Sequence, residues 1–333
     1  MKIKMNIKTK MLVFILVTTI LIFATAVGYI SFSSRKMAFH DATRYSNKVA
    51  GEYAVRIQEE LSNDMAIIRT LAQAYSVYHS LPQDQWKAIF IEMYHEVFQN
   101  NPHFYKLWDS WEFSMIDPTW TKPYGRYVVT YYREGGSVKY STTTRSLDGD
   151  PARYAKVKAE GEESIWEPYF DSFVEQGQTR KFMSTLSAPI RYQGKYVGIV
   201  AVDIIMEKFQ QIVAEIKPFE GSYAFLVSNM GVFIGHPNQE IIGKSLKEYI
   251  PELNARFLID EKIKNGENFS IEMLDPEYNY DAYLSFAPIY VGKSKTPWSV
   301  GLVVPVDVVT YEARINFFIS MFVGILGDRK SVV

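Results

Sequence analysis

The strongest hydrophobic feature of the chain is an apolar run near its N-terminus, "MLVFILVTTILIFATAVGYISF", residues 11–32. The run carries no charged residue, and as a helix it would be about 33 Å long, enough to cross a bilayer. A cleaved signal peptide, the alternative, has a shorter apolar region and a small-residue cleavage site. Lysines at positions 2, 4, 8 and 10 come before the run. The positive-inside rule therefore predicts a cytoplasmic N-terminus (1–10) and a transmembrane helix over 11–32.

Between residues 33 and 80, apolar positions recur every three or four residues, as they do on one face of a helix. From Arg35 to Tyr78 the chain has no proline and one glycine, and Pro82 follows. The pattern predicts a long stalk helix over 33–80, continuous or nearly so with the membrane span. Its apolar face carries Val49, Tyr53, Ile57, Leu61, Met65, Ile68, Ala72 and Tyr75. The stretch "QWKAIFIEMYHEVFQNNP" predicts a second helix.

Further along, the apolar period changes to two, which is typical of strands. "RYVVTYYREGGSVKYSTTT" predicts a hairpin that turns at Gly135-Gly136, and "RKFMSTLSAPIRYQGKYVGIVAVDI" predicts another at Gln193-Gly194. A helix, "MEKFQQIVAEIK", separates these from a third hairpin turning near residues 229–231 and from a final set of strands. Hairpin-linked strands with segregated helices predict an α+β fold with antiparallel sheets.

One phrase occurs twice. "APIRYQGKYVGIVAVDI" begins at Ala188, and "APIYVGKSKTPWSVGLVVPVDV" begins at Ala287, and each contains a Val-Asp pair near its end. We interpret the repeat as two copies of one small module outside the membrane. The predicted boundaries are a membrane-distal module over 81–205, a connecting helix over 206–218, and a membrane-proximal module over 219–309.

A second apolar run, "INFFISMFVGILG", covers residues 315–327 and is too short to span a bilayer. We expect it to be the start of a second, truncated transmembrane helix. The last six residues, "DRKSVV" (328–333), match the translated start of a sequencing adapter, so a non-native tail is expected there. The alternative is a short basic cytoplasmic tail.

Composition narrows the class of protein. The net charge of −1, with no cluster of basic and aromatic residues, argues against a nucleic-acid partner. The chain has no cysteine, which excludes disulfides and thiolate metal sites. The five histidines show no ligand spacing, and the sequence contains no nucleophile elbow, zinc-protease helix or phosphate loop. We therefore predict no metal, no cofactor and no catalytic residue in this chain.

Several phrases, in this order, resemble a known family: the long helix, "EPYFDS", "SAPIRYQGKYVGIVAVDI" and "GSYAFLVSNMGVFIGHPNQEIIGKSL". Together they resemble the extracytoplasmic double Cache domain of bacterial transmembrane receptors. Such receptors include methyl-accepting chemotaxis proteins, sensor histidine kinases and diguanylate cyclases. The resemblance implies two PAS-like modules, a small-molecule pocket in the distal one, and a homodimer that signals across the bacterial inner membrane. The ectodomain would be periplasmic or extracellular.

In family members that bind amino acids, the pocket motif has an arginine, a Trp-Tyr pair, Tyr-x-Asp, and an aspartate at the end of the last strand. Tyr154, Tyr169, Asp171 and Asp203 fit the later positions. The arginine and tryptophan have no match, because Pro151 and Arg153 stand where they would fall.

The residue types in this motif suggest a ligand class. Two carboxylates facing one space, Asp171 and Asp203, would be relieved by a ligand ammonium group, and aromatic walls also suit a cation. We therefore predict an amine-bearing or otherwise cationic small molecule, while Arg126 leaves a zwitterion or anion contact open. The predicted aromatic walls are Tyr169, Tyr154, Tyr131, Trp108 and Trp111.

Each residue also has a structural interpretation. Asp203 could cap a helix, Asp171 could form a turn, Trp108 and Trp111 could belong to the core, and Arg126 could pair with Glu112 or Asp117. The leading functional prediction is small-molecule sensing, with the cytoplasmic output domain absent from this chain. A membrane-anchored enzyme or an adhesion module is the alternative.

Overall fold

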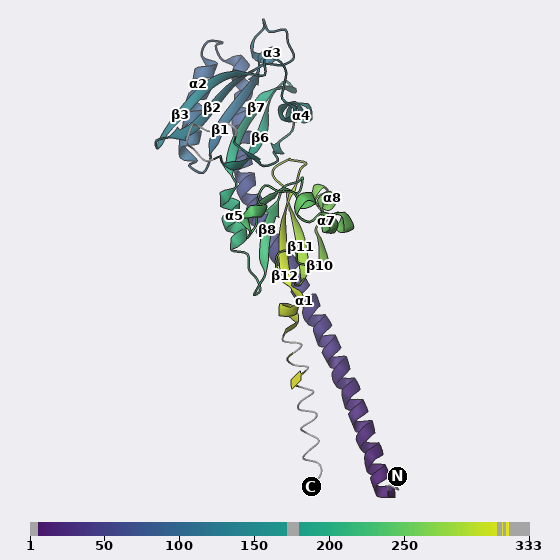
Figure 1. The fold of residues 1–333 in the computed structure, drawn as a ribbon. Helices are drawn as coiled ribbons and strands as arrows, with labels where there is room; N and C mark the ends of the chain where they lie inside the picture. Colours follow the sequence, from purple (N-terminus) through teal and green to yellow (C-terminus); the bar gives the residue numbers. More distant parts are fainter. Residues whose placement is uncertain (1–5, 172–179, 312–314, 316–317, 320–333) are drawn as a thin grey trace.

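The computed structural model describes residues 6–171, 180–311, 315 and 318–319. Its backbone is organised by one helix, α1 (Ile7–Tyr75), which is continuous for 69 residues and ends in a short 3₁₀ turn, η1 (Ser76–Ser80). The predicted span and stalk are thus one helix. Its apolar N-terminal part is exposed, lies apart from both sheets (Figure 1), and is long and apolar enough to cross a membrane.

The first sheet has seven antiparallel strands in the order β3-β2-β1-β7-β6-β4, with β5 also paired to β6. The strands are β1 (Lys106–Glu112), β2 (Arg126–Glu134), β3 (Ser137–Arg145), β4 (Ser164–Ile165), β5 (Tyr169–Phe170), β6 (Phe182–Tyr192) and β7 (Lys195–Ile205). The helices α2 (Trp86–Asn100), α3 (Phe113–Ile116) and α4 (Ala152–Glu160) belong to this part of the chain. Figure 1 shows this sheet at the end of the molecule far from the N-terminus.

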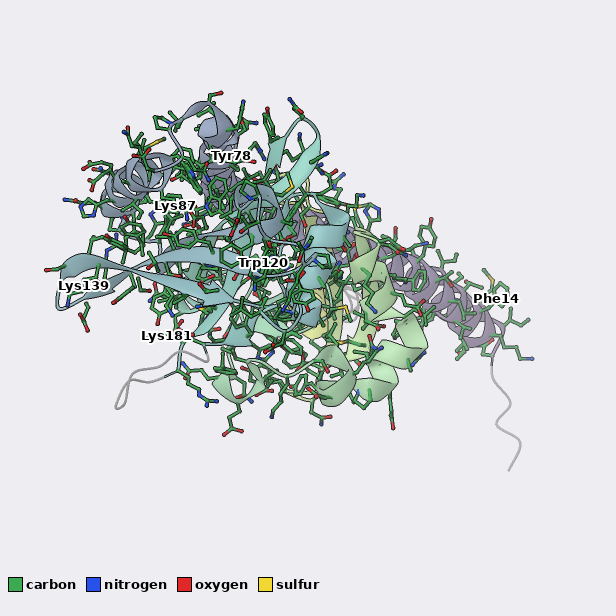
Figure 2. The ribbon with its side chains drawn as sticks, turned by 90° about the horizontal axis from the view of Figure 1, so that it is seen from above. Phe14, Tyr78, Lys87, Trp120, Lys139 and Lys181 are labelled. Carbon is green, nitrogen blue, oxygen red and sulfur yellow. The ribbon has the colours of Figure 1, made fainter. Side chains whose placement is uncertain are left out.

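Both hairpin turns predicted for this region are confirmed. Gly135 and Gly136 have positive φ angles of 57° and 80°, as a two-residue hairpin loop requires. Gln193 and Gly194, between β6 and β7, also have positive φ angles, of 50° and 79°. The β2–β3 hairpin extends away from the body of the molecule, with Lys139 near its tip (Figure 2).

The second sheet has five antiparallel strands in the order β10-β11-β12-β8-β9. They are β8 (Tyr223–Val227), β9 (Phe233–Gly235), β10 (Phe269–Leu274), β11 (Asp281–Ile289) and β12 (Trp298–Pro305). Between the sheets lies α5 (Glu207–Ala214), and between β9 and β10 lie η2 (Gln239–Ile241), α6 (Leu246–Tyr249), α7 (Pro251–Phe257) and α8 (Ile259–Lys264). Starting from β2, the first sheet runs β2-β1-β7-β6-β4, which is the same order as β9-β8-β12-β11-β10.

Both sheets pack one face against α1, and this shared interface is the main core. Buried α1 residues such as Ile57, Leu61, Met65, Ile68 and Tyr75 join apolar residues of both sheets in one cluster. Those are the positions that the three-to-four periodicity predicts. The α+β fold with two antiparallel sheets on a long N-terminal helix is therefore confirmed.

The module boundaries predicted at 81–205, 206–218 and 219–309 stay predictions, although the strands of the two sheets fall inside them. Most of the predicted second span (315–327) and all of the predicted non-native tail (328–333) lie outside the described residues.

Residues 163–171, here called the bridging segment, connect the two sheets. Ile165 belongs to β4 of the first sheet, and its backbone N–H and carbonyl bond the hydroxyls of Ser294 and Thr296 in the β11–β12 loop. Glu167 accepts hydrogen bonds from the Ser228 hydroxyl and from the backbone N–H of Met230, both in the β8–β9 turn. The last part of the segment contains β5.

Candidate ligand-binding site

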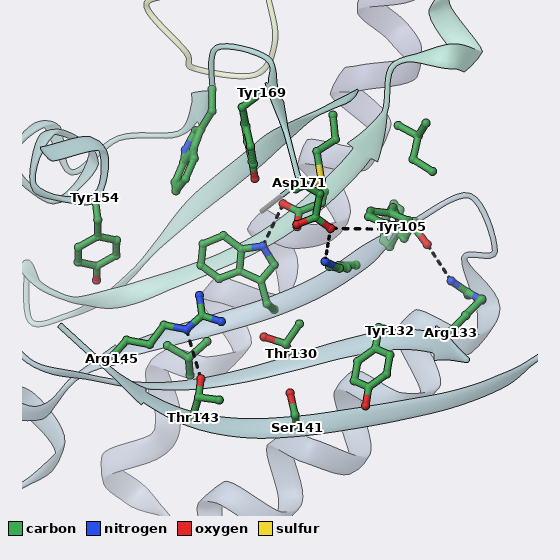
Figure 3. A pocket seen from close by; sticks show the side chains of 18 of the residues that line it. Tyr105, Thr130, Tyr132, Arg133, Ser141, Thr143, Arg145, Tyr154, Tyr169 and Asp171 are labelled. Carbon is green, nitrogen blue, oxygen red and sulfur yellow. Dashed lines mark hydrogen bonds and ion pairs between the residues drawn. The ribbon is translucent and has the colours of Figure 1, made fainter. Parts of the chain in front are cut away.

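A cavity of about 970 Å³ lies on the face of the first sheet that points away from α1. Figure 3 shows Tyr169 and Asp171 on one side of it and Thr130 and Ser141 on the other. The volume is typical of a small-molecule site. The ionisable side chains that line it, apart from tyrosine and histidine, are Lys106, Arg126, Arg133, Glu134, Arg145, Arg153, Asp171 and Asp203.

Asp203 lies inside β7 and is 4% exposed. One carboxylate oxygen accepts hydrogen bonds from the Thr185 hydroxyl (2.7 Å) and from the Trp108 indole N–H (3.1 Å). Burial raises the pKa of Asp203 to about 6, and these hydrogen bonds and Lys106 oppose that rise. Asp203 does not cap a helix, since α5 begins four residues later with Met206 at its cap.

Asp171 follows β5 directly and is as deeply buried as Asp203. The Lys106 ammonium lies 2.5 Å from its carboxylate, and the Tyr105 hydroxyl lies at 3.4 Å. Lys106 is directly opposite Asp203 in the β1–β7 pairing, so one ammonium group lies beside both carboxylates. The two predicted acids therefore do line the same cavity, and a lysine of the chain already lies between them.

Tyr169 and Arg153 form an adjacent wall. The Tyr169 hydroxyl is 2.8 Å from that of Thr185, which in turn bonds Asp203. The Arg153 guanidinium lies over the Tyr169 ring, 4.5 Å from its centroid, and 5.7 Å from the ring of Trp166. Burial raises the pKa of Tyr169. Its hydroxyl therefore stays protonated and is able to donate.

Tyr154 and Arg126 lie toward the β2 side of the cavity. The Arg126 guanidinium stacks on the Tyr154 ring at 3.6 Å, and the Tyr154 hydroxyl donates to Glu112 at 2.7 Å. The ion pair of Arg126 is with Asp150, at 3.9 Å, whereas Glu112 pairs with Lys158 at 2.5 Å. Both predicted residues line the cavity.

The structure corrects the prediction for Trp111 and Tyr131, which do not line this cavity. Both are fully buried in the core against α1 and α2: the Trp111 ring stacks on Tyr75 at 5.9 Å, and the Tyr131 hydroxyl donates to the carbonyl of Ile91. The reason is the two-residue period of a strand. Trp108 and Trp111 are three residues apart, so they lie on opposite faces of β1.

Lys106, Thr185 and Arg145 were not predicted from the sequence, and Arg153 had no predicted role. All four line the cavity or bond a residue that does. Strand parity could have found part of this set. Arg126, Val128, Thr130 and Tyr132 alternate on β2, and each of them lines the cavity. In the part of the chain that the structure describes, no three His, Asp or Glu residues gather as a metal site.

Two antiparallel sheets of matching strand order pack on one long helix, and the first sheet carries the cavity. This is the fold of two tandem PAS-like modules. The chain belongs to the Cache domain family, whose sequence pattern matches residues 34–313. The double Cache resemblance is thereby confirmed.

Among curated proteins, the chain is similar to the methyl-accepting chemotaxis protein PctB of Pseudomonas aeruginosa. The identity is 26% over 186 residues, which is 54% of this chain and 27% of PctB. The chain thus spans about a quarter of the length of the curated relatives that it matches first.

Two solved structures show the same fold. One is the extracellular domain of the histidine kinase mmHK1S-Z3 (24% identity, TM-score 0.64, covering 88% of this chain and 98% of that one). The other is the ligand-binding domain of the Pseudomonas aeruginosa amino acid chemoreceptor PctC in complex with GABA (21% identity, TM-score 0.52, covering 79% and 100%). These relatives are sensor domains rather than enzymes.

Proposed function

We propose that this chain is the extracytoplasmic sensing part of a bacterial transmembrane receptor that binds a small organic molecule in the first-sheet cavity. The observation that carries the proposal is the cavity itself, in which buried Asp203 and Asp171 face a space of about 970 Å³. Charged and hydrogen-bonding groups that converge on one open space are typical of a small-molecule site.

The ligand in this proposal bears both an amine and an acidic group. Asp203 and Asp171 would accept from the ammonium, and Arg153 would bind a carboxylate. A ligand that is only cationic fits less well, because five of the lining residues are Lys or Arg and three are Asp or Glu. The solved PctC domain in complex with GABA, itself an amine-bearing carboxylate, supports this class.

The signal in this proposal leaves through α1, which packs on both sheets and continues into the apolar segment. The basic N-terminus would lie in the cytoplasm and the sheets outside the inner membrane. The receptor in this proposal is a homodimer, as the family resemblance implies. The output would be chemotaxis, a kinase or a cyclase in a cytoplasmic domain, and we propose no catalytic role for the chain itself.

The test is a thermal-shift screen of the full chain in detergent against amino acids and amines, followed by calorimetry with any compound that stabilises it. Asp203→Ala should weaken binding by about 2–5 kcal/mol, because it removes a buried charged partner of the ligand. Asp307→Ala is the control, because Asp307 belongs to the second Val-Asp pair of the repeated phrase and is not among the residues that line the cavity. Equal affinity of Asp203→Ala and the unmodified chain would rule this site out.

A further inference from the structure

One ammonium group of the chain already lies where the amine of the proposed ligand would bind. Lys106 is the first residue of β1, and its Nζ lies 2.5 Å from a carboxylate oxygen of Asp171. The ring of Tyr105 lies 5.1 Å from the same Nζ, and the Tyr105 hydroxyl lies 3.4 Å from that carboxylate (Figure 3). Carboxylates and aromatic faces are the groups that bind an ammonium ion. The lysine side chain therefore shows which chemical group this end of the cavity accepts.

The charge of Lys106 also acts on Asp203, the second acid of the cavity. The two residues lie directly opposite each other on β1 and β7. Burial raises the pKa of Asp203, and Lys106 is among the groups that oppose this rise. Among the described residues, the hydrogen bonds to the Asp203 carboxylate come from Thr185 and Trp108, and both end on Oδ1. A ligand ammonium at Oδ2 would break neither of these bonds.

Lys106 is able to leave this position, whereas the carboxylate beside it is held in place. A lysine carries a compact charge on a flexible four-carbon stem. The Lys106 side chain is 16% exposed, against 1% for that of Asp171, and it lies at the end of a strand rather than in its middle. A rotation of the stem would therefore remove the ammonium from Asp171 without moving the sheet.

A buried aspartate of this fold does not require a charged partner. Asp275 is 1% exposed, and its carboxylate accepts from the neutral hydroxyl of Tyr223 at 2.7 Å and from two backbone N–H groups. A neutral donor at position 106 would hold Asp171 in the same way. The positive charge of Lys106 therefore has a role other than keeping the carboxylate buried.

Displacing Lys106 costs more for some ligands than for others. A ligand that carries only an amine would take the place of the lysine and leave its ammonium without the Asp171 partner, which is costly in partly buried surroundings. A ligand that also carries a carboxylate offers the displaced ammonium a new partner.

We propose that Lys106 makes the cavity specific for ligands that carry both an amine and an acidic group. When such a ligand binds, its amine takes the position of the Lys106 ammonium, and Lys106 turns to the ligand carboxylate. The inference rests on the proposed function, because it assumes that the ligand amine lies at Asp203 and Asp171. It adds the residue that rejects simple amines.

The experiment compares amino acids with the amines that remain when their carboxylate is removed, by calorimetry on the full chain in detergent. The pairs are γ-aminobutyrate with propylamine, L-leucine with isoamylamine, and L-phenylalanine with phenethylamine. In the unmodified chain, at least one amino acid should bind about tenfold or more tightly than its amine. Lys106→Gln keeps a hydrogen-bond donor near Asp171 and removes the charge. It should lower that preference at least about fivefold, chiefly by binding the amine more tightly.

Two further variants separate the charge from the position. Lys106→Arg keeps a positive charge and should keep most of the preference for the amino acid. Lys195→Gln is the matched control, because Lys195 is also the first residue of its strand, is exposed, and is not among the residues that line the cavity. It should change neither affinity.

Several results would overturn the role of Lys106 and leave the proposed function standing. These are equal affinities within every pair that binds the unmodified chain, an unchanged preference in Lys106→Gln, and an equal loss of preference in Lys106→Gln and Lys106→Arg. A Lys106→Gln chain that no longer folds, as judged by thermal melting, would also overturn it, because the charge would then be a structural requirement. Absence of binding by all six compounds would contradict the proposed function as well.

Discussion

The two sheets share a strand order and a helix, yet their outer faces differ completely. In the first sheet the outer face is a cavity lined by charged and hydroxyl groups. In the second sheet it is a solid apolar core in which Phe225, Phe233 and Phe286 pack with Ile259 and Val303. The part of the chain that contains the helices α6, α7 and α8 contributes residues to this core.

One row of residues shows how the difference arises. The pairings Ala188–Val200 and Ala287–Val300 align the two copies of the repeated phrase. Three residues before the two alanines lie Thr185 and Leu284, and three residues after the two valines lie Asp203 and Val303. The neighbours of Asp203 and Val303 on the next strand are Lys106 and Tyr223. Thr185, Asp203 and Lys106 of the first sheet therefore correspond to Leu284, Val303 and Tyr223 of the second. The same backbone positions thus hold a polar network in one sheet and apolar core in the other. These side chains distinguish the face that lines the cavity from the face that forms a core.

The strongest test of this comparison exchanges the central residue of the row. Val303→Asp should lower the free energy of unfolding by more than about 4 kcal/mol, because it buries a carboxylate with no partner in an apolar core. Asp203→Val, the reverse exchange, should change it by less than about 1 kcal/mol, since Asp203 already lies beside a cavity. Urea titration of the chain in detergent measures both. A Val303→Asp variant of unchanged stability would contradict the contrast.

A second test compares aromatic truncations on the two outer faces. Phe286 is fully buried and stacks on Phe269 at 4.6 Å, so Phe286→Ala should cost about 3–5 kcal/mol of unfolding free energy. Tyr132 lines the cavity and is half-buried, so Tyr132→Ala should cost less than about 1.5 kcal/mol. Similar losses for the two variants would mean that the first-sheet face is packed as a core.

The smallest expected effect is a dependence of stability on pH that comes from β1 and β7. Burial raises the pKa of Asp203 to about 6 and that of Asp109, on the core face of β1, to about 7. The folded chain therefore holds these protons more tightly than the unfolded chain. The stability that these two protons contribute should be fully present below about pH 4 and be lost progressively as the pH rises to about 6 for Asp203 and about 7 for Asp109.

The variants Asp203→Asn and Asp109→Asn separate the two contributions to this slope. Asp203→Asn should flatten the part below about pH 6, and Asp109→Asn should remove the larger part that extends to about pH 7. Unfolding free energies measured at several pH values would show this, and a slope unaffected by either substitution would exclude both groups as its origin.

Local signals predicted much of the fold. The glycine turns at Gly135-Gly136 and Gln193-Gly194 identified their hairpins because few other residues adopt positive φ. The apolar period along α1 identified the helix face that both sheets bury. These features depend on neighbours within a few residues, so a single sequence contains them.

The site was predicted less well, because it depends on which face of a strand a residue takes and on pairing register. Trp111 and Tyr131 have the right residue type on the wrong face. The repeated Val-Asp pair was misleading in the same way: Asp307 follows β12, and the true counterpart of Asp203 is Val303. Lys106 carries no motif, and only the β1–β7 register shows that it lies beside both carboxylates.

The bridging segment forms one wall of the cavity, and the same stretch of backbone also connects the two sheets. Tyr169 and Asp171 face the cavity, while Glu167, only two residues before Tyr169, is bonded to the β8–β9 turn of the second sheet. A displacement of Tyr169 and Asp171 would therefore act on the second sheet through the hydrogen bonds of a residue only two positions away. Because β11 and β12 of the second sheet pack on α1, the cavity wall and the long helix are separated by a single sheet.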